Sequence, residues 1–253
     1  MTSSLTLLVA GGAILLLAGM VKGLVGMGLP TVGIGLLSLM LPPAEAAAVL
    51  ILPAAVTNVW QYATGPNPVA TARRFGWMMA GVAAGTIAGG MLLGGLTSPL
   101  AVPALGATLL AYGALGLSAV PLRLPAAAER PLSPLMGVLT GLVTGTTGVS
   151  VMPSAPYLQA LGLGRDELVQ ALGLTFTVST FALAVVLAGP GAGGTVLANP
   201  ALVLASVAAL APAFLGMEIG RRVRGAVSPQ VFRRVFFAGL GLLGAYMLAR
   251  GFL

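Results

Sequence analysis

Long apolar stretches, separated by short segments that carry most of the arginines, run along the whole chain. Most of them are about 20 residues long, the length of an α-helix that crosses the hydrocarbon core of a membrane. Strands of a membrane barrel would instead alternate in hydrophobicity over about ten residues. The chain is therefore predicted to be an all-α, polytopic helical membrane protein. The stretches cover residues 5–41, 44–63, 75–96, 100–120, 132–163, 168–188, 201–220 and 231–253.

The first and fifth stretches are much longer than one membrane span. Each is interrupted by glycines and a proline, in GMVKGLVGMGLP from Gly19 and in GTTGVSVMP from Gly145. Glycine and proline end helices or form turns, so we expect each stretch to be a broken helix or a pair of helices folded back on itself. Irregular backbone at membrane depth is tolerated where it is buried in protein or lines a cavity.

The most polar and proline-rich segment, PLRLPAAAERPLSP, separates two halves with similar patterns. GMVKGLVGMG from Gly19 resembles GVLTGLVTGT from Gly137, and PAAVTN from Pro53 occupies the place of TFTVST from Thr175. Similarities that recur in the same order indicate an internal repeat. The predicted units are an N-terminal transmembrane repeat at 1–120, a cytoplasmic linker at 121–134 and a C-terminal transmembrane repeat at 135–253.

The arginines predict how the halves are oriented. Basic loops are typically cytoplasmic, so the linker and the loop of Arg165 are expected on one side, and the fifth stretch must enter the membrane and return. If the first stretch does the same, each half is a hairpin followed by three spans. Two such halves form an inverted repeat with both termini outside, a secondary-transporter architecture in which the two breaks are expected to meet at a midplane substrate site. The arginines in question are Arg73, Arg74, Arg123, Arg130, Arg165, Arg221, Arg222, Arg224, Arg233 and Arg234, whereas segments 96–99 and 189–200 have none.

The composition narrows the chemistry. Hydrophobic residues make up 58% of the chain, charged residues 7%, and the mean hydropathy is +1.04. Cysteine and histidine are absent, which excludes a disulfide, a thiolate nucleophile and the usual zinc ligands, so we expect no metal, no cofactor and no enzymatic activity. The net charge of +7 falls mostly in short loops, which argues against nucleic-acid binding.

No buried proton relay or nucleotide site can be recognised. The carboxylates lie in loops or near the ends of stretches, and Glu218 can pair with Arg221 and Arg222 at helical spacing. The chain has no P-loop, which excludes ATP-driven transport by this chain alone. The carboxylates are Glu45, Glu129, Asp166, Glu167 and Glu218.

Lys22 is the only lysine among twelve basic residues and stands just before the first break. An ionisable side chain at membrane depth is costly unless it is paired or hydrated, so we favour a functional role for it. The alternative is that the break lies near the cytoplasmic face, where Lys22 would extend to the surface as a topology signal.

The two breaks are predicted to form a cradle for an anion. Glycine lets backbone approach a ligand closely, helices that begin at a break direct free N–H groups at an anion, and hydroxyls add neutral donors. The residues predicted for this role are Gly23, Gly26, Gly28, Gly141, Gly145, Thr146, Thr147, Gly148 and Ser150.

Glycines spaced by four also allow helices to pack closely. We favour this interpretation for the run from Gly81 to Gly89, and for the run from Gly137 to Gly145 it carries the same weight as ligand binding.

Four polar residues within apolar stretches complete the predicted binding site. Asn58 and Gln61 lie one helical turn apart and either line the cavity or bond to a neighbouring helix. Thr175 and Ser179 share a helix face, with Thr180 nearby, and either line the cavity or bond to the carbonyl four residues earlier.

GLVTGTTGVSVMPSAPYLQALGLGRDELVQALGLTFTVSTFALA from Gly141, together with AGMVKGLVGMGLPTVGIGLL from Ala18, resembles the sulfite exporter TauE/SafE family. The similarity extends over essentially the whole chain in length, number of stretches and internal repeat. It implies a bacterial inner-membrane transporter that exports sulfite or organosulfur anions such as sulfonates. In many members a break contains three successive glycines, where this chain has GMGLP and GTTGVS. The family's glycine-rich breaks correspond to Gly23, Gly26, Gly28, Gly141, Gly145 and Gly148.

We therefore expect a secondary transporter or facilitator that exports a small anion by alternating access, with Lys22 as the nearest positive charge. Its expected partners are the anionic substrate and the lipid bilayer, and a second copy of the chain in a homodimer is a further candidate. The multi-pass protein would have both termini in the periplasm. A proton-coupled importer of an organic acid and a non-transporting membrane scaffold stay as alternatives.

Overall fold

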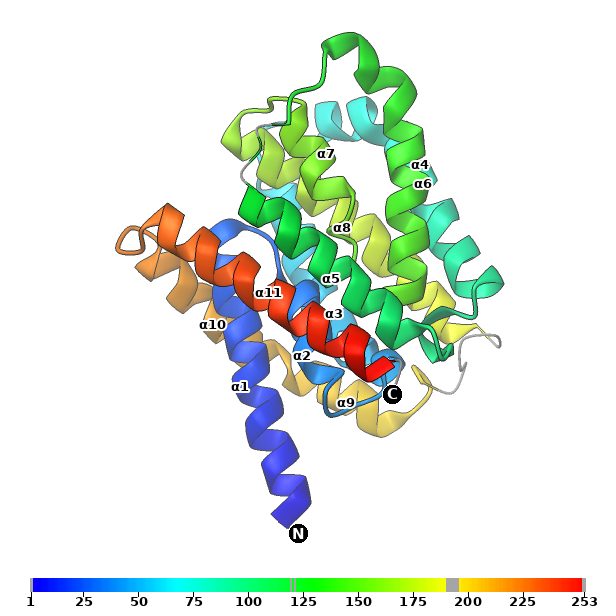
Figure 1. Ribbon diagram of the computed structural model, residues 1–253, viewed down its shortest axis with the longest axis vertical. Coiled ribbons are helices and arrows are strands. Elements are labelled where there is room, and N and C mark those ends of the chain that lie inside the picture. The colour runs from blue at the N-terminus through cyan, green and yellow to red at the C-terminus, as the bar shows by residue number, and fades with distance from the viewer. Residues whose placement is uncertain (1, 119, 121, 190–195, 252–253) are drawn as a thin grey trace.

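The computed structural model describes residues 2–118, 120, 122–189 and 196–251, without the side chains of residues 2–6. Every regular element in these ranges is helical, which confirms the predicted all-α class (Figure 1). Seven helical stretches among them are long and apolar enough to cross a membrane. Pro121 of the predicted linker and residues 190–195 of the predicted arginine-free segment lie outside the described residues.

The first half contains a long helix, a short helix and then three long helices. Prolines stand in the first turns of α2, α3 and α4, where a helix does not need the missing N–H group. The elements are α1 (Thr2–Val25), α2 (Leu29–Leu37), α3 (Pro43–Ala63), α4 (Pro68–Leu92), the 3-10 turn η1 (Gly95–Thr97) and α5 (Ala101–Ser118).

The second half repeats this order, except that its fourth member is divided. The span predicted over 201–220 breaks at Ala209, because Pro212 has no N–H group to donate to the carbonyl of Ala208. The elements are α6 (Ala126–Thr147), α7 (Ser154–Ala160), α8 (Arg165–Ala188), α9 (Pro200–Ala208), α10 (Leu210–Val223) and α11 (Pro229–Gly251). Helix α6 begins inside the predicted linker, and the division into two repeats at 121–134 stays a prediction.

Both short helices return beside the long helix that precedes them. Just before α6, the backbone N–H of Leu124 donates to the carbonyl of Ala160 at the end of α7, at 2.9 Å. In the first half, Leu41 after α2 shares an apolar cleft with Leu7 near the start of α1. The two long stretches therefore fold back on themselves, each as a long helix, a break and a short returning helix.

Glycines bring two pairs of parallel helices into close contact. A Cβ atom on Gly85 of α4 would collide with the carbonyl oxygen of Val138 in α6, and one on Gly23 of α1 with that of Met217 in α10. Because a backbone carbonyl cannot turn away as a side chain can, only glycine permits these crossings. The packing role favoured for the run from Gly81 to Gly89 is confirmed.

The remaining long helices pair antiparallel. In α5 and α11, which lie side by side in Figure 1, Gly106 meets Gly244 whereas Gly113 meets Phe237. In α3 and α8, Asn58 bonds to Thr180, whereas three residues further along α3 the side chain of Gln61 bonds to the backbone of Val169, which lies earlier in α8.

If each helix is replaced by the helix with the same place in the other half, the set of helix pairs stays the same. Helices with the same place in the two halves pair with each other, α3 with α8 and α5 with α11, while α1 with α10 corresponds to α6 with α4. An inverted repeat would produce such pairs, and it stays a prediction. The orientation of each half in a membrane stays a prediction.

Candidate functional site

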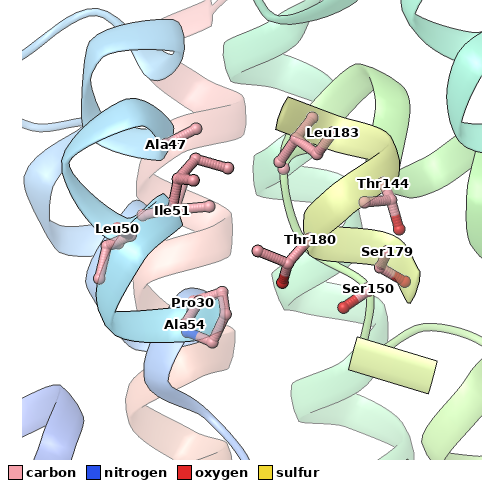
Figure 2. A pocket seen from close by; sticks show the side chains of 12 residues that line it. Pro30, Ala47, Leu50, Ile51, Ala54, Thr144, Ser150, Ser179, Thr180 and Leu183 are labelled. Atoms are coloured by element: carbon pink, nitrogen blue, oxygen red, sulfur yellow. The ribbon is translucent and has the colours of Figure 1, made fainter. Parts of the chain in front are cut away.

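A small cavity lies where α3 of the first half faces α8 of the second half (Figure 2). Its volume of about 20 Å³ leaves room for about one water molecule. One wall is apolar and consists of Ala47, Leu50, Ile51 and Ala54 of α3, together with Pro30 at the start of α2. Helices from both halves therefore contribute to the cavity.

The opposite wall carries hydroxyl groups (Figure 2). Thr144, Ser179 and Thr180 each donate their proton to the backbone carbonyl four residues earlier, over 2.7–2.8 Å. The sequence left two alternatives for Ser179, lining the cavity or bonding to the carbonyl four residues earlier. The structure shows both. Ser150, which follows the second break, makes no side-chain hydrogen bond to any described residue. The wall therefore presents mainly hydroxyl lone pairs, with the proton of Ser150 free.

Lys22 is the one buried charged side chain in the described part of the chain, with only 4% of its surface exposed. Its ammonium group donates to the Oδ1 of Asn58, which is itself fully buried. The Nδ2 of Asn58 donates in turn to the hydroxyl of Thr180 over 3.3 Å. A hydrogen-bonded chain thus runs from the lysine to the cavity wall, and the alternative in which Lys22 extends to a surface is not what the structure shows.

The two breaks are built on glycines with positive φ angles. Gly26 and Gly28 have φ of 79° and 110°, and Gly148 has φ of 75°, a region that L side chains rarely adopt. In each case the turn ends a long helix and redirects the chain into the short returning segment.

The glycines of the two breaks lie against different elements, but both breaks reach the cavity. Gly26 lies next to Val169 near the start of α8, whereas Gly148 lies next to Ile34, Ala47 and Leu96. Each long helix continues for its full length before it breaks. The first break borders the cavity through Pro30, and the second break borders it through Gly148 and Ser150.

Comparison with known families decides what kind of protein this is. A family model described as sulfite exporter TauE/SafE matches residues 11–247, nearly the whole chain. The chain belongs to the sulfite exporter TauE/SafE family. Neither the curated proteins nor the solved structures contain a match to it. Lys22, both breaks and all the cavity walls of this TauE/SafE protein fall inside the matched range, and the family resemblance inferred from the two glycine-rich segments is confirmed.

Several residues predicted to bind substrate in this TauE/SafE protein reach the cavity or its hydrogen-bonded chain. Gly148, Ser150 and Ser179 line the cavity, and Lys22 and Asn58 connect to it.

Three predicted cradle glycines instead lie in helix crossings. Gly23 faces the backbone of α10, and Gly141 and Gly145 face the backbone of α4. Gly26 and Gly28 form the turn of the first break and do not themselves line the cavity. The spacing of four that suggested a ligand cradle in the second half therefore reflects packing at Gly141 and Gly145.

The other predicted polar residues make local or interhelical bonds. Gln61 donates to the carbonyl of Val169 over 2.8 Å and joins α3 to α8. Thr146, Thr147 and Thr175 donate to backbone carbonyls of their own helices. None of these four side chains lines the cavity.

Two residues of the cavity wall, a threonine and a proline, were not among the predicted site residues. Thr144 stands four residues before Gly148, so the two share one face of α6, a spacing that could have indicated it. Pro30 ends the GMGLP segment at the first break, yet its position against α3 depends on how α2 folds back. Sequence reasoning did not supply that position.

Proposed function

We propose that this protein is a secondary transporter or facilitator that exports a small anion, sulfite or an organosulfonate, across the bacterial inner membrane. Membership of the TauE/SafE family supports an anion exporter. The observation that carries the proposal is the buried Lys22, joined through Asn58 to a wall of the cavity between the two halves.

Lys22 supplies a positive charge that has no acidic partner. No carboxylate of the described residues forms a salt bridge with it, and its hydrogen-bond acceptor is a neutral amide. A buried cation without a counter-charge is costly, so an anion that enters the site would provide the missing charge. The site thereby favours an anion over a neutral or cationic substrate.

Transport requires the cavity to open. The space between α3 and α8 holds about one water molecule, whereas sulfite has four non-hydrogen atoms. Because the two walls belong to different halves, rocking of one half against the other would widen the cavity and expose it to each side in turn. The hydroxyls of Thr144, Ser179 and Thr180 would then rotate their protons from carbonyls toward the anion, since a hydroxyl turns to suit its partner.

The membrane potential can drive export without a buried acid. A potential that is negative inside favours outward movement of each negative charge by about 2.3 kcal/mol per 100 mV. No carboxylate is buried in the described part of the chain, so a facilitator driven by potential needs fewer elements than a proton-coupled carrier does. We extend the proposal to a multi-pass protein of two inverted halves with both termini in the periplasm.

The test measures release of radiolabelled sulfite from liposomes that contain the purified protein, while a potassium gradient and valinomycin set the potential. We expect efflux that increases with an inside-negative potential, is retained by Lys22→Arg and is lost in Lys22→Met. Uptake that needs a proton gradient would support the importer instead. Absence of transport across a panel of sulfonates and carboxylates would favour the scaffold.

A further inference from the structure

A second, larger cleft lies beside the first break. It consists of two adjoining hollows of about 310 and 320 Å³ between α5, α7, α11 and the turn that joins α10 to α11. Arg233, Tyr112, Gln159 and Phe237 line both hollows. We call this cleft the basic vestibule. Either hollow could hold an organic molecule of moderate size, which the cavity between α3 and α8 could not.

Two arginines give the basic vestibule its charge. Arg224 and Arg233 line it from the end of α10 and from α11. In the described part of the chain neither guanidinium forms a salt bridge, whereas Arg74, Arg221 and Arg222 each pair with a glutamate. Both guanidiniums are therefore available to a carboxylate, a sulfonate or a phosphate, which arginine binds in a bidentate manner.

The surroundings of Arg224 increase the local positive field. Partial burial, reinforced by the nearby Arg165, lowers the pKa of Arg224 below its ordinary value, against a smaller opposite effect of Asp166. A guanidinium stays protonated at neutral pH, so the repulsion from Arg165 is not relieved by loss of a proton. An anion bound here would reduce that repulsion.

The vestibule also presents a group of aromatic rings. Phe232 stacks on Phe236 with centroids 5.4 Å apart, Phe236 contacts Phe237 at 5.1 Å, and Tyr112 meets Phe237 edge-on at 5.1 Å. The three phenylalanines are only partly buried, so part of their surface faces the hollow and can take up an apolar group. A bare inorganic anion would leave this surface unused.

The vestibule adjoins the first break. Leu24, Val25 and Met27 form part of its wall, and the hydroxyl of Tyr112 donates to the sulfur of Met27 over 3.2 Å. Lys22 lies two residues before Leu24 and bonds to Asn58 of α3 instead. The buried lysine is therefore not part of the vestibule wall.

We propose that the basic vestibule is a binding site for an amphipathic organic anion. The acidic group would bind Arg224 and Arg233, with the amide of Gln159 nearby, and the apolar body would contact Phe232, Phe236 and Phe237. Two sources share this chemistry, a free organosulfonate or carboxylate and the headgroup of an anionic phospholipid. This binding does not rest on the proposed function, because Lys22 does not line either hollow.

The test measures binding of benzenesulfonate to the purified full-length protein by isothermal titration calorimetry in neutral detergent. Arg233→Gln should weaken binding about tenfold or more, since one charge-assisted pair is lost. The matched control is Arg234→Gln, the adjacent arginine on α11, which does not line either hollow and should leave the dissociation constant unchanged. Benzenesulfonamide, the neutral isostere, and methanesulfonate, which lacks the ring, should each bind much more weakly than benzenesulfonate.

Nanodiscs distinguish the two sources of the anion. If phosphatidylglycerol discs weaken benzenesulfonate binding relative to phosphatidylcholine discs, and Arg233→Gln removes that difference, the native occupant is a lipid headgroup. Equal affinities in both discs point to a soluble anion. The proposal is overturned if the Arg233 and Arg234 variants bind benzenesulfonate alike, or if wild type does not bind it.

Lys22→Met separates this proposal from the proposed function. It should leave benzenesulfonate binding intact while sulfite efflux is lost. Intact binding in a protein that transports nothing would overturn the proposed function alone, and normal efflux without any binding would overturn the vestibule alone.

Discussion

In the hairpin of α1 and α2 a buried lysine precedes the break, whereas the hairpin of α6 and α7 carries Thr144, Thr146, Thr147 and Ser150 around its break and no charge. Otherwise the two are built alike. Each has a long helix that packs through glycines on a parallel neighbour, a turn with positive-φ glycine and a short helix that returns. The repeated backbone accounts for where the chain is irregular, and the residues at each break account for the difference in chemistry.

The two chemistries are brought together by the central helices. Asn58 of α3 binds the lysine of the first hairpin, and Thr180 of α8 stands in the same wall as the hydroxyls of the second. Under the proposed function, the charge of one hairpin and the hydroxyls of the other bind the same substrate, and the charge contributes more binding free energy than any single hydroxyl. Substitutions in matching places of the two hairpins test this inequality.

The largest difference is expected for Lys22→Met, which should lower the rate of sulfite efflux by about 1000-fold, or about 4 kcal/mol, because a buried charge partner of the substrate is lost. The melting temperature in detergent should stay the same or rise, since an unpaired buried cation is removed. Lys22→Arg, which keeps the charge, serves as the control in the same efflux assay. If Lys22→Met lowers the melting temperature but the folded protein keeps its rate of sulfite efflux, the role of the lysine is structural.

Substitution at the helix crossings should affect the two hairpins equally. Gly23→Ala and Gly145→Ala each direct a methyl group into a backbone carbonyl of the neighbouring helix, so each should lower stability by roughly 3 kcal/mol. Chemical denaturation in mixed micelles gives the measurement. Gly12→Ala is the matched control, because its methyl group would meet nothing within 4 Å, and alanine in place of a helical glycine should be neutral or gain up to about 1 kcal/mol. A large cost in only one hairpin would show that the crossings are not equivalent.

A smaller effect is expected at the second break itself. Alanine at Gly148, with φ of 75°, would place its Cβ 2.8 Å from Ile34 and 3.2 Å from Leu96. Gly162→Ala provides the reference, because Gly162 has φ of 67° and open space around it. Both variants carry the strain of positive φ. Gly148→Ala should therefore lower the free energy of unfolding by about 1 kcal/mol more than Gly162→Ala does, and this difference measures the packing around the break. Equal losses would mean that backbone strain alone selects glycine there.

The smallest effect is expected for Ser150→Ala. Its hydroxyl is one neutral donor among several in the wall, so the KM for sulfite should rise about threefold with little change in kcat, which corresponds to less than 1 kcal/mol. Initial rates over a range of sulfite concentrations provide the measurement. A loss as large as that of Lys22→Met would remove the proposed difference between the hairpins.

Much of the site could be anticipated where a residue is unusual for its position. Lys22 was predicted from the cost of a charge in lipid, Gly148 from the close backbone approach that glycine allows, and Ser150 as a neutral donor after the break. Glycine runs were harder to interpret, because packing and ligand approach both favour the absence of a side chain. The sequence could not distinguish the two roles, and the structure places Gly141 and Gly145 in the packing contact with α4.

Pattern along the chain was sufficient to predict the all-helical membrane class, the interruption of the two long stretches and the single lysine at the first break. Length, hydropathy and the cost of buried polar groups act locally along the chain, so pattern alone expresses them. Three features depend on the folded chain: Lys22 bonds to Asn58, Asn58 bonds to Thr180, and Pro30 of the first break lines one cavity with Ser150 of the second. Contacts between residues 36 and 122 positions apart depend on how whole helices cross, and that is set by packing over many residues at once.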